Sequence, residues 1–370
     1  MKEGEPTVST SMNTVNLNMM NKPNHWIYAD KIASSAAITV DQHRFQIKQA
    51  DRGNSGDIVA VRVVENRQNS NPLELGNGRL ATVNFGDIVI GVLGNRRALK
   101  GFVGTVPKKL AVGDHLHVLN LGGIIGQLSG SQQGLERPIQ VEYLGSVVDS
   151  SGNFASIRKN AIKPESDYLS PVPLVLVSGT CMQAGKTKVA GELVKRFRHH
   201  HYKVAAAKLT GIACLRDTLL MEDYGAIKTL SFLNCGLPST IEVNDVGQLA
   251  KGIVKELNKE NPDVIIIELG DGLLGYYNVD SLFNDEQIMT ATAAIPLCAN
   301  DFAGVFGAIQ FLKEKGVGVD VVSGPATDSP MAVDFIENQL GTPAANALNG
   351  ANKLFNLVEE KVIKWQQMKC

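Results

Sequence analysis

The chain has 370 residues and a mass of 39.8 kDa, enough for two ordinary domains, and its 44% hydrophobic and 20% charged residues are typical of globular proteins. The 36 Lys and Arg against 37 Asp and Glu give a net charge of -1, so no overall attraction to nucleic acid or to an anionic membrane is expected. No stretch approaches the roughly 20 apolar residues of a membrane helix. The five scattered cysteines lack metal-type spacing and favour free thiols in a cytoplasmic protein.

The N-terminal part of the chain predicts a leader followed by strands. Residues 1–25 are rich in Asn, Ser, Thr and Met, lack an apolar signal core and predict a poorly ordered leader. From residue 26 to residue 150, short alternating apolar runs broken by glycine predict an all-β domain. Three turns share a Gly-Asp pair directly before an apolar strand, at Gly56-Asp57, Gly86-Asp87 and Gly113-Asp114. These turns resemble those of small cradle-loop barrels, so we expect a small barrel-like domain, with a β-sandwich as the alternative.

The rest of the chain changes its pattern. Residues 151–172 are polar and predict a linker, and residues 173–370 alternate strands with helices. The predicted strands are LVLVSG, KVAAAKL, DVIIIEL and VDVVSGP, and the predicted helices cover Lys186–His200, the segment from Asp245 to the Asn261-Pro262 stop, and the segment after Asn346. This alternation predicts an α/β domain with a mostly parallel sheet covered by helices on both faces.

The most informative motif follows the first of these strands and reads SGTCMQAGKT. Backbone N–H groups at a helix start, together with the helix dipole, favour phosphate oxygens. We expect Lys186 to reach the β- and γ-phosphates of ATP, and the Thr187 hydroxyl to bind Mg²⁺. In the common pattern G-x-x-x-x-G-K-T the first glycine would fall at Thr180, whereas here Gly179 lies one residue earlier; an ordinary strand-to-helix turn is the alternative interpretation. The predicted ATP-binding residues are Gly179, Thr180, Cys181, Met182, Gln183, Ala184, Gly185, Lys186 and Thr187.

The loop resembles that of dethiobiotin synthetase and its relatives, in which G-T-x-x-x-x-G-K-T is the usual form. This resemblance implies a P-loop NTPase fold. It also implies that Lys208, at the end of VAAAK, is a second phosphate- or substrate-binding lysine, and that Glu268, at the end of VIIIE, is an acid that binds Mg²⁺.

A second resemblance covers residues 173–345 more closely. The run KLTGIACLRDTLLMEDYGAIKTLSFLNCGLPST is similar to a segment of the D-glutamate N-acetyltransferase-like P-loop family. The matching residues are Lys208, Thr210, Gly211, Asp217, Asp223, Gly225, Ala226, Gly236, Pro238, Ser239 and Thr240. Where that family typically has Glu-Gly-Gln-Gly after the third strand, this chain has Glu268-Leu269-Gly270-Asp271-Gly272, so the substrate contacts of that loop do not carry over. The resemblance to dethiobiotin synthetase does not explain the β-rich domain.

Position along the predicted sheet supports these roles. Lys208 and Glu268 follow apolar strands, and ligands of open parallel sheets bind at the carboxyl ends of the strands. We expect Lys186, Lys208 and Glu268 to be catalytic, and Thr187 and Glu268 to bind the metal. The alternative interpretations are that Lys208 is a lysine at the edge of the sheet and that Glu268 is an acid on the surface. Asp217 and Asp223 are candidate substrate ligands or helix caps. Ser239 and Thr240 are candidate ligands for an anionic group or simple turn residues.

Three functions fit these residues. The first is an ATP- and Mg²⁺-dependent kinase or ligase that transfers the γ-phosphoryl group to a small acidic metabolite, as the dethiobiotin synthetase resemblance implies. The second is an N-acyltransferase acting on an amino acid, as the other resemblance implies. The third is a nucleotide-dependent switch ATPase with a protein partner. We rank the first highest, and the resemblance implies a homodimer.

Overall fold

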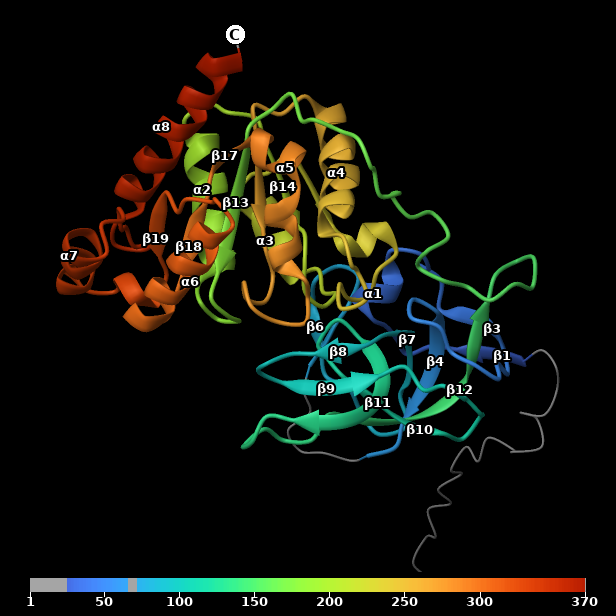
Figure 1. Cartoon of the computed structure of the whole chain (residues 1–370). Helices are drawn as coiled ribbons and strands as arrows, with labels where there is room; N and C mark the ends of the chain where they lie inside the picture. Colours follow the sequence, from blue (N-terminus) through green and yellow to red (C-terminus); the bar gives the residue numbers. More distant parts are fainter. Residues whose placement is uncertain (1–24, 66–71, 370) are drawn as a thin grey trace, which may run out of the picture.

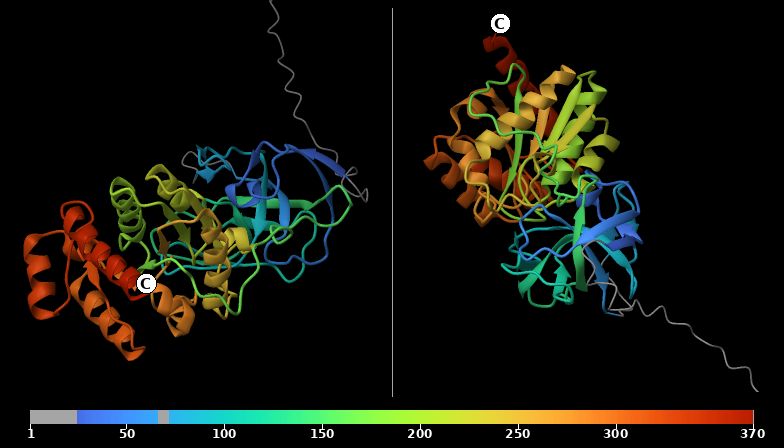
Figure 2. Two further views of the ribbon diagram at one scale, coloured as in Figure 1. Left: turned by 90° about the horizontal axis from the view of Figure 1, so that it is seen from above. Right: turned by 90° about the vertical axis from the view of Figure 1, so that its right-hand side faces the viewer.

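The computed structural model describes residues 25–65 and 72–369. Within them the chain forms two units that lie against each other, a barrel unit (residues 25–157) and an α/β unit (residues 173–369) (Figures 1 and 2). The predicted leader lies outside the described residues, except for His25, which begins the first strand.

The barrel unit contains short strands and one short helix. In chain order these are β1 (His25–Tyr28), β2 (Lys31–Ile32), α1 (Ser34–Ala37), β3 (Arg44–Lys48), β4 (Ile58–Val63), β5 (Leu73–Glu74), β6 (Leu80–Ala81), β7 (Ile88–Leu93), β8 (Arg96–Arg97), β9 (Phe102–Thr105), β10 (His115–Val118), β11 (Ile124–Ser131) and β12 (Gln140–Val148). The pairings β4–β7, β7–β11, β11–β10, β10–β12 and β12–β4 return to their starting strand and close a barrel. The expected small barrel is therefore confirmed over the sandwich.

The three Gly-Asp turns adopt one geometry, directly before β4, β7 and β10. In each the glycine has a positive φ, of 97° at Gly56, 84° at Gly86 and 94° at Gly113. The following Asp carboxylate accepts the N–H of the residue three positions earlier: Asp57 from Asn54 at 2.8 Å, Asp87 from Asn84 at 2.6 Å and Asp114 from Ala111 at 2.7 Å. The local turn chemistry read from the sequence thus sets the start of three barrel strands.

The α/β unit is a parallel sheet with helices on both faces. Its strands are β13 (Leu174–Gly179), β14 (Val204–Lys208), β15 (Lys228–Ser231), β16 (Val264–Glu268), β17 (Thr292–Ala294), β18 (Pro296–Cys298) and β19 (Val321–Ser323). Its α-helices are α2 (Lys186–His199), α3 (Arg216–Asp223), α4 (Val246–Leu257), α5 (Glu286–Ala291), α6 (Phe302–Glu314), α7 (Pro330–Gln339) and α8 (Ala351–Lys369). The strand order is β15-β14-β16-β13-β18-β19, with β17 also beside β13. Short 3₁₀ helices cover Phe232–Cys235, Asn258–Glu260, Val279–Asn284 and Pro325–Thr327.

Alternate residues of the buried strands pack into different cores. In β13, Leu174 and Leu176 contact the face covered by α4 and α6, whereas Val175 and Val177 contact the face covered by α2 and α8. Figure 1 shows α2 and α8 on one side of the sheet and α4 on the other. Because both faces are covered, these strands are apolar throughout, which is why the sequence shows them as continuous apolar runs.

The barrel unit docks at the carboxyl edge of the parallel sheet. The Glu74 carboxylate accepts the backbone N–H of Leu215 at 2.7 Å, and the Asn120 side-chain amide donates to the Ala213 carbonyl at 2.7 Å. A Cβ at Gly122 would overlap the same Ala213 carbonyl, so the two backbones approach as closely as glycine allows. One apolar core continues from the barrel into the α4 face of the sheet, and the docking therefore fixes the barrel over the strand ends.

The segment that joins the two units runs along the α/β unit. The N–H of Ile162 donates to the Asn234 carbonyl at 2.9 Å, and the N–H of Glu165 donates to the Gln248 carbonyl at 3.0 Å. Lys251 of α4 donates from Nζ to the Ser166 carbonyl at 2.8 Å. Residues 158–172 therefore pack along α4 and help to hold the two units together.

Candidate functional site

The glycine-rich segment forms a loop between β13 and α2. Gln183 and Gly185 have positive φ values of 63° and 93°, and Gly185 is the residue before the first turn of α2. The backbone N–H groups of Met182, Gln183 and Gly185 donate to no acceptor within the part of the chain that the structure describes. A run of N–H groups at the start of a 14-residue helix is an anion-binding arrangement.

Lys186 lies across the loop and is 5% exposed. Its Nζ donates to the Cys181 carbonyl at 2.7 Å, and its stem lies over Gly179, where an added Cβ would come within 2.8 Å of it. Burial lowers the pKa of Lys186, an effect that the Glu268 carboxyl opposes. The glycine that stands one residue earlier than in the common motif therefore makes room for the lysine stem.

Thr187 and Glu268 form a cluster of oxygen ligands beside the loop. The Thr187 hydroxyl donates to Glu268 Oε1 at 2.7 Å, and Asp217 Oδ1 lies 3.4 Å from the same hydroxyl. Glu268 Oε2 is buried and has no hydrogen-bond partner among the described residues. Burial raises the pKa of Glu268 to about 7, and the Asp217 carboxylate adds to this shift. A hydroxyl, two carboxylates and one unpartnered buried oxygen fit Mg²⁺, which binds hard oxygen ligands together with substrate phosphates.

Lys208 and Asp217 form a buried ion pair behind this cluster. Lys208 is 7% exposed, its Nζ contacts Asp217 Oδ2, and Cys214 Sγ lies 3.9 Å from Nζ. Burial works against the charged lysine, but its neighbours Cys214, Asp217 and Glu268 together raise its pKa. The pair links α3 to β14, and the contacts of Asp217 with Thr187 extend it to the phosphate loop.

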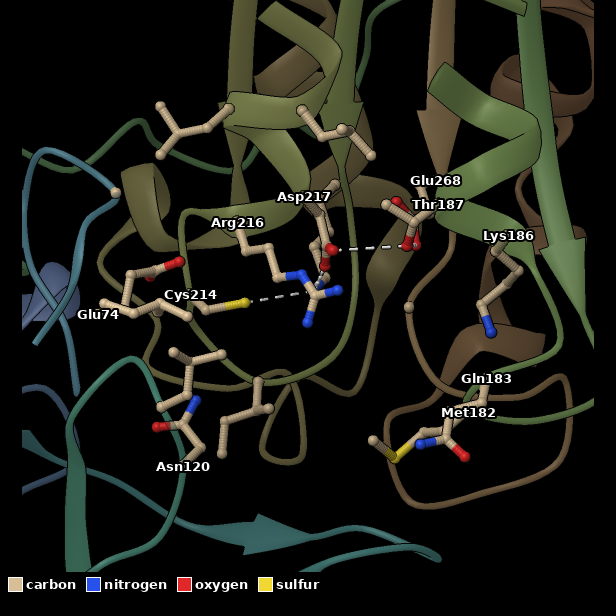
Figure 3. Close-up of a pocket in the computed structure, with 18 of the residues that line it drawn as sticks. Glu74, Asn120, Met182, Gln183, Lys186, Thr187, Cys214, Arg216, Asp217 and Glu268 are labelled. Atoms are coloured by element: carbon tan, nitrogen blue, oxygen red, sulfur yellow. Dashed lines mark hydrogen bonds and ion pairs between the residues drawn. The ribbon is translucent and has the colours of Figure 1, made fainter. Parts of the chain in front are cut away.

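A cavity of about 1110 Å³ joins this edge to the barrel. Figure 3 shows Lys186 and Gln183 on one side of it and Glu74 and Asn120 on the other, with Arg216 reaching into the space between them. The α/β unit contributes Met182, Gln183, Gly185, Lys186, Thr187, Lys208, Cys214, Arg216, Asp217, Glu268 and Asp271, and the barrel unit contributes Glu74, Asn77, Arg96, Phe102 and Asn120. The site is therefore built by both units.

The structure brings some of the predicted substrate residues to this cavity and leaves others away from it. Asp217 and Asp223 both line it, and Asp223 lies at the end of α3, where it is exposed. Ser239 and Thr240 are buried and are not among the lining residues. Thr240 Oγ1 accepts the N–H of Gly211 at 3.1 Å and donates to the Tyr277 carbonyl at 3.2 Å, so its hydroxyl holds two loops together.

Several residues that line the cavity belong to no motif that the sequence analysis identified. Arg216 precedes the predicted Asp217 in sequence and could have been found from the position of its neighbour alone. Glu74, Arg96 and Asn120 reach the cavity from barrel segments that lie 66 to 112 residues before Lys186 in the sequence. Their contribution depends on the docking of the two units, for which no local sequence signal exists.

The α/β unit has a P-loop NTPase fold, with a phosphate-type loop between a central parallel strand and its helix and an acid at the end of the adjacent strand. Cys181 to Thr187 form the loop that leads from β13 into α2, and Glu268 ends the adjacent strand β16. Among the described residues, no helix is long and apolar enough to cross a membrane. No group of three or more His, Cys, Asp or Glu side chains in the described ranges is arranged to hold a metal ion.

No protein-family model and no curated protein matches this sequence. Among solved structures, the signal recognition particle receptor FtsY from Elizabethkingia anophelis is similar over 56% of this chain and 69% of its own, with 16% identity and a TM-score of 0.38. A DUF1611 family protein from Anabaena variabilis is similar over 55% of this chain and 64% of its own, with 15% identity and a TM-score of 0.41. The 54 kDa signal recognition particle protein from Aeropyrum pernix in complex with GDP is similar over 57% of this chain and 53% of its own, with 15% identity and a TM-score of 0.36.

Proposed function

We propose that this protein is an ATP- and Mg²⁺-dependent enzyme that transfers the γ-phosphoryl group to a small acidic acceptor bound between its two units. The observation that carries the proposal is the shared cavity. Its volume of about 1110 Å³ lies above the roughly 300–1,000 Å³ of a typical single-ligand site. The phosphate loop forms one wall and the barrel another, so a nucleotide and a second small molecule fit side by side.

The charges of the site suit phosphoryl transfer. Lys186 and Lys208 place two buried cations at the edge where the phosphates would lie, and Arg216 adds a third positive group from α3. Thr187 and Glu268 would hold Mg²⁺, which supplies charge neutralisation for the phosphate oxygens. The barrel covers the strand ends and limits the access of water. Positioning and charge stabilisation are most of what this reaction requires from a protein.

The resemblance of the loop to that of dethiobiotin synthetase supports ATP as the nucleotide and a carboxylate or carbamate as the acceptor. An acceptor of this kind would become a mixed anhydride with phosphate when its oxygen displaces ADP. The acyltransferase and the switch ATPase place no second small anion beside the γ-phosphate. The basic side chains of Arg216 and Arg96, which line the cavity in addition to Lys186, could hold such an anion and therefore favour the transfer reaction.

The test is release of ADP or GDP from ATP–Mg²⁺ or GTP–Mg²⁺ by the full chain, with and without a panel of small carboxylic acids. We expect acid-stimulated ADP release, lost in Lys186→Ala and retained in Lys195→Ala, a matched control on the same helix away from the loop. Nucleotide binding without turnover under any acid would contradict the proposal. Thiol release from acetyl-coenzyme A, or turnover stimulated only by a protein, would favour the two other functions.

A further inference from the structure

The barrel presents one buried cation to the cavity, Arg96 in β8, which the function above does not use. Arg96 is 8% exposed and lines the cavity from the barrel unit. Its Nη1 donates to the Leu119 carbonyl, and its Nε is buried without an acceptor among the described residues. The adjacent Arg97 is exposed and instead lies over the ring of Tyr276, at 5.5 Å from the ring centroid.

The surroundings of Arg96 form a fixed space for its guanidinium. A Cβ at Gly101 would overlap Nη2 of Arg96, and the φ of +117° at Gly101 is one that residues with side chains rarely adopt. The ring of Phe102 lies 5.9 Å from the guanidinium carbon and covers one side of it. The side chain is therefore held in place before any ligand binds, which lowers the entropy cost of binding.

No carboxylate of the described residues forms a direct ion pair with this guanidinium. Tyr277 and Asp271 act on it electrostatically and raise its pKa, against the larger effect of burial. Burial disfavours its charge and lowers its pKa, yet an arginine stays protonated in proteins. A buried charge without a partner is costly, and a ligand with the opposite charge would remove that cost.

We propose that Arg96 binds a carboxylate of the acceptor and so makes the barrel unit the part of the protein that selects an acidic substrate. The planar fork of a guanidinium matches the two oxygens of a carboxylate, with two parallel hydrogen bonds. The phosphates of the nucleotide would have their own ligands at the loop between β13 and α2. This proposal rests on the proposed function, because it assigns the acceptor end of the same cavity.

The experiment is direct calorimetric binding to the full chain in the presence of Mg²⁺ and a non-hydrolysable ATP analogue. The probes are malonate, succinate, glutarate and citrate, with succinamide as the neutral control and inorganic phosphate as the competing anion. We expect the carboxylates to bind the native protein and the Arg97→Gln control equally. In Arg96→Gln their affinity falls about tenfold to a hundredfold, the range for a hydrogen bond to a charged group.

The Arg96→Lys variant distinguishes an effect on carboxylate binding from an effect on folding, because lysine keeps the positive charge but lacks the planar pair of N–H donors of the guanidinium. We expect it to bind carboxylates with intermediate affinity, with an unchanged affinity for the ATP analogue and an unchanged thermal midpoint without ligand. Carboxylates that fail to bind the native protein, or bind Arg96→Gln and Arg96→Lys as well as the native protein, would overturn the proposal. Phosphate binding at Arg96 in their place would overturn the carboxylate assignment.

The two proposals fail in different ways. Arg96-dependent carboxylate binding without any acid-stimulated ADP release would leave the carboxylate site standing and remove the phosphoryl-transfer function. Acid-stimulated ADP release that is unchanged in Arg96→Gln would leave the function standing and remove Arg96 from the acceptor site.

Discussion

The two units bury charge in different ways. In the α/β unit, Lys186, Lys208 and Glu268 are buried within one cluster at the strand ends, where opposite charges face each other. In the barrel unit, Arg96 and Glu74 are buried separately, and Glu74 bonds to Ser34 and to the α/β unit. The first arrangement is typical of a reaction centre and the second of a wall that closes over it. Substitutions in the two units should therefore change different properties.

The largest effect is expected on the stability of the α/β unit, from the ion pair between Lys208 and Asp217. Asp217→Ala leaves Lys208 buried without its closest partner, and breaking a buried pair typically costs about 3–5 kcal/mol. Urea unfolding of the variant measures this loss. Asp223→Ala, at the exposed end of the same helix, is the matched control and should stay within about 0.5 kcal/mol of the native protein.

The double variant Lys208→Met with Asp217→Leu tests whether the loss of stability comes from the unpaired buried charge. Replacing both charges by apolar groups removes the cost of burying them, so stability should recover while turnover stays lost. A double variant as unstable as Asp217→Ala alone would mean that α3 depends on other contacts of these side chains.

The next effect is on the reaction, at Glu268. Glu268→Gln keeps an acceptor for the Thr187 hydroxyl but removes the charge that would hold Mg²⁺. We expect turnover to fall about 10²–10³-fold, as when one charge-stabilising group is removed from an active site, and the Mg²⁺ concentration for half-maximal turnover to rise. Turnover measured against Mg²⁺ tests both, with Glu260→Gln on the surface as control. An unchanged Mg²⁺ dependence would remove Glu268 from the metal site.

The contrast between the two units also explains which parts of the structure could be predicted from the sequence. The positions of the loop before α2, of Lys208 and of Glu268 were predictable because each lies at the end of an apolar strand, and parallel strands end at one edge. The Gly-Asp turns were predictable because their hydrogen bonds span three residues. Arg96, Glu74 and Asn120 were not, because their role arises from the packing of one unit on the other. Thr240 matched a family segment, but its hydroxyl bonds to backbone.

A smaller effect is expected where the two units meet, at Glu74. Its carboxylate accepts from the Ser34 hydroxyl and from the Leu215 N–H, and loss of such bonds in Glu74→Ala should cost about 1–3 kcal/mol. Glu74→Gln should cost less, because the amide oxygen can still accept. Equal losses in the two variants would show that the charge of Glu74 matters rather than its hydrogen bonds.

The two tryptophans of the chain let each unit be followed separately. Trp26 lies in β1 of the barrel and Trp365 in α8 of the α/β unit. Fluorescence of Trp26→Phe and Trp365→Phe proteins should give one coincident unfolding transition, because an apolar core runs through both units. In the Glu74→Ala background the two transitions should move apart. If the two unfolding transitions are already separate in proteins that keep Glu74, the result would contradict a shared core.

The smallest effects are expected at the Gly-Asp turns of the barrel. Asp57 and Asp114 are exposed or half-buried, and each accepts a backbone N–H of its own turn, at 2.8 Å and 2.7 Å. Asp→Ala at either position should lower the free energy of unfolding by about 1 kcal/mol. The two losses should add, since the turns share no partner. The Asn variants should lose less, because the amide oxygen can replace the carboxylate as acceptor.

Asp87 differs from the other two because Lys31 also pairs with it. Asp87→Ala should therefore cost more than Asp57→Ala, and Asp87→Asn should lose the ion pair but keep the turn. Chemical unfolding measures these losses, and turnover is measured on the same samples. Since none of the three turns lines the cavity, turnover by the folded protein should stay at the native level. A turn variant that remains folded but loses turnover would show that barrel geometry itself, beyond its cavity-lining side chains, contributes to the reaction.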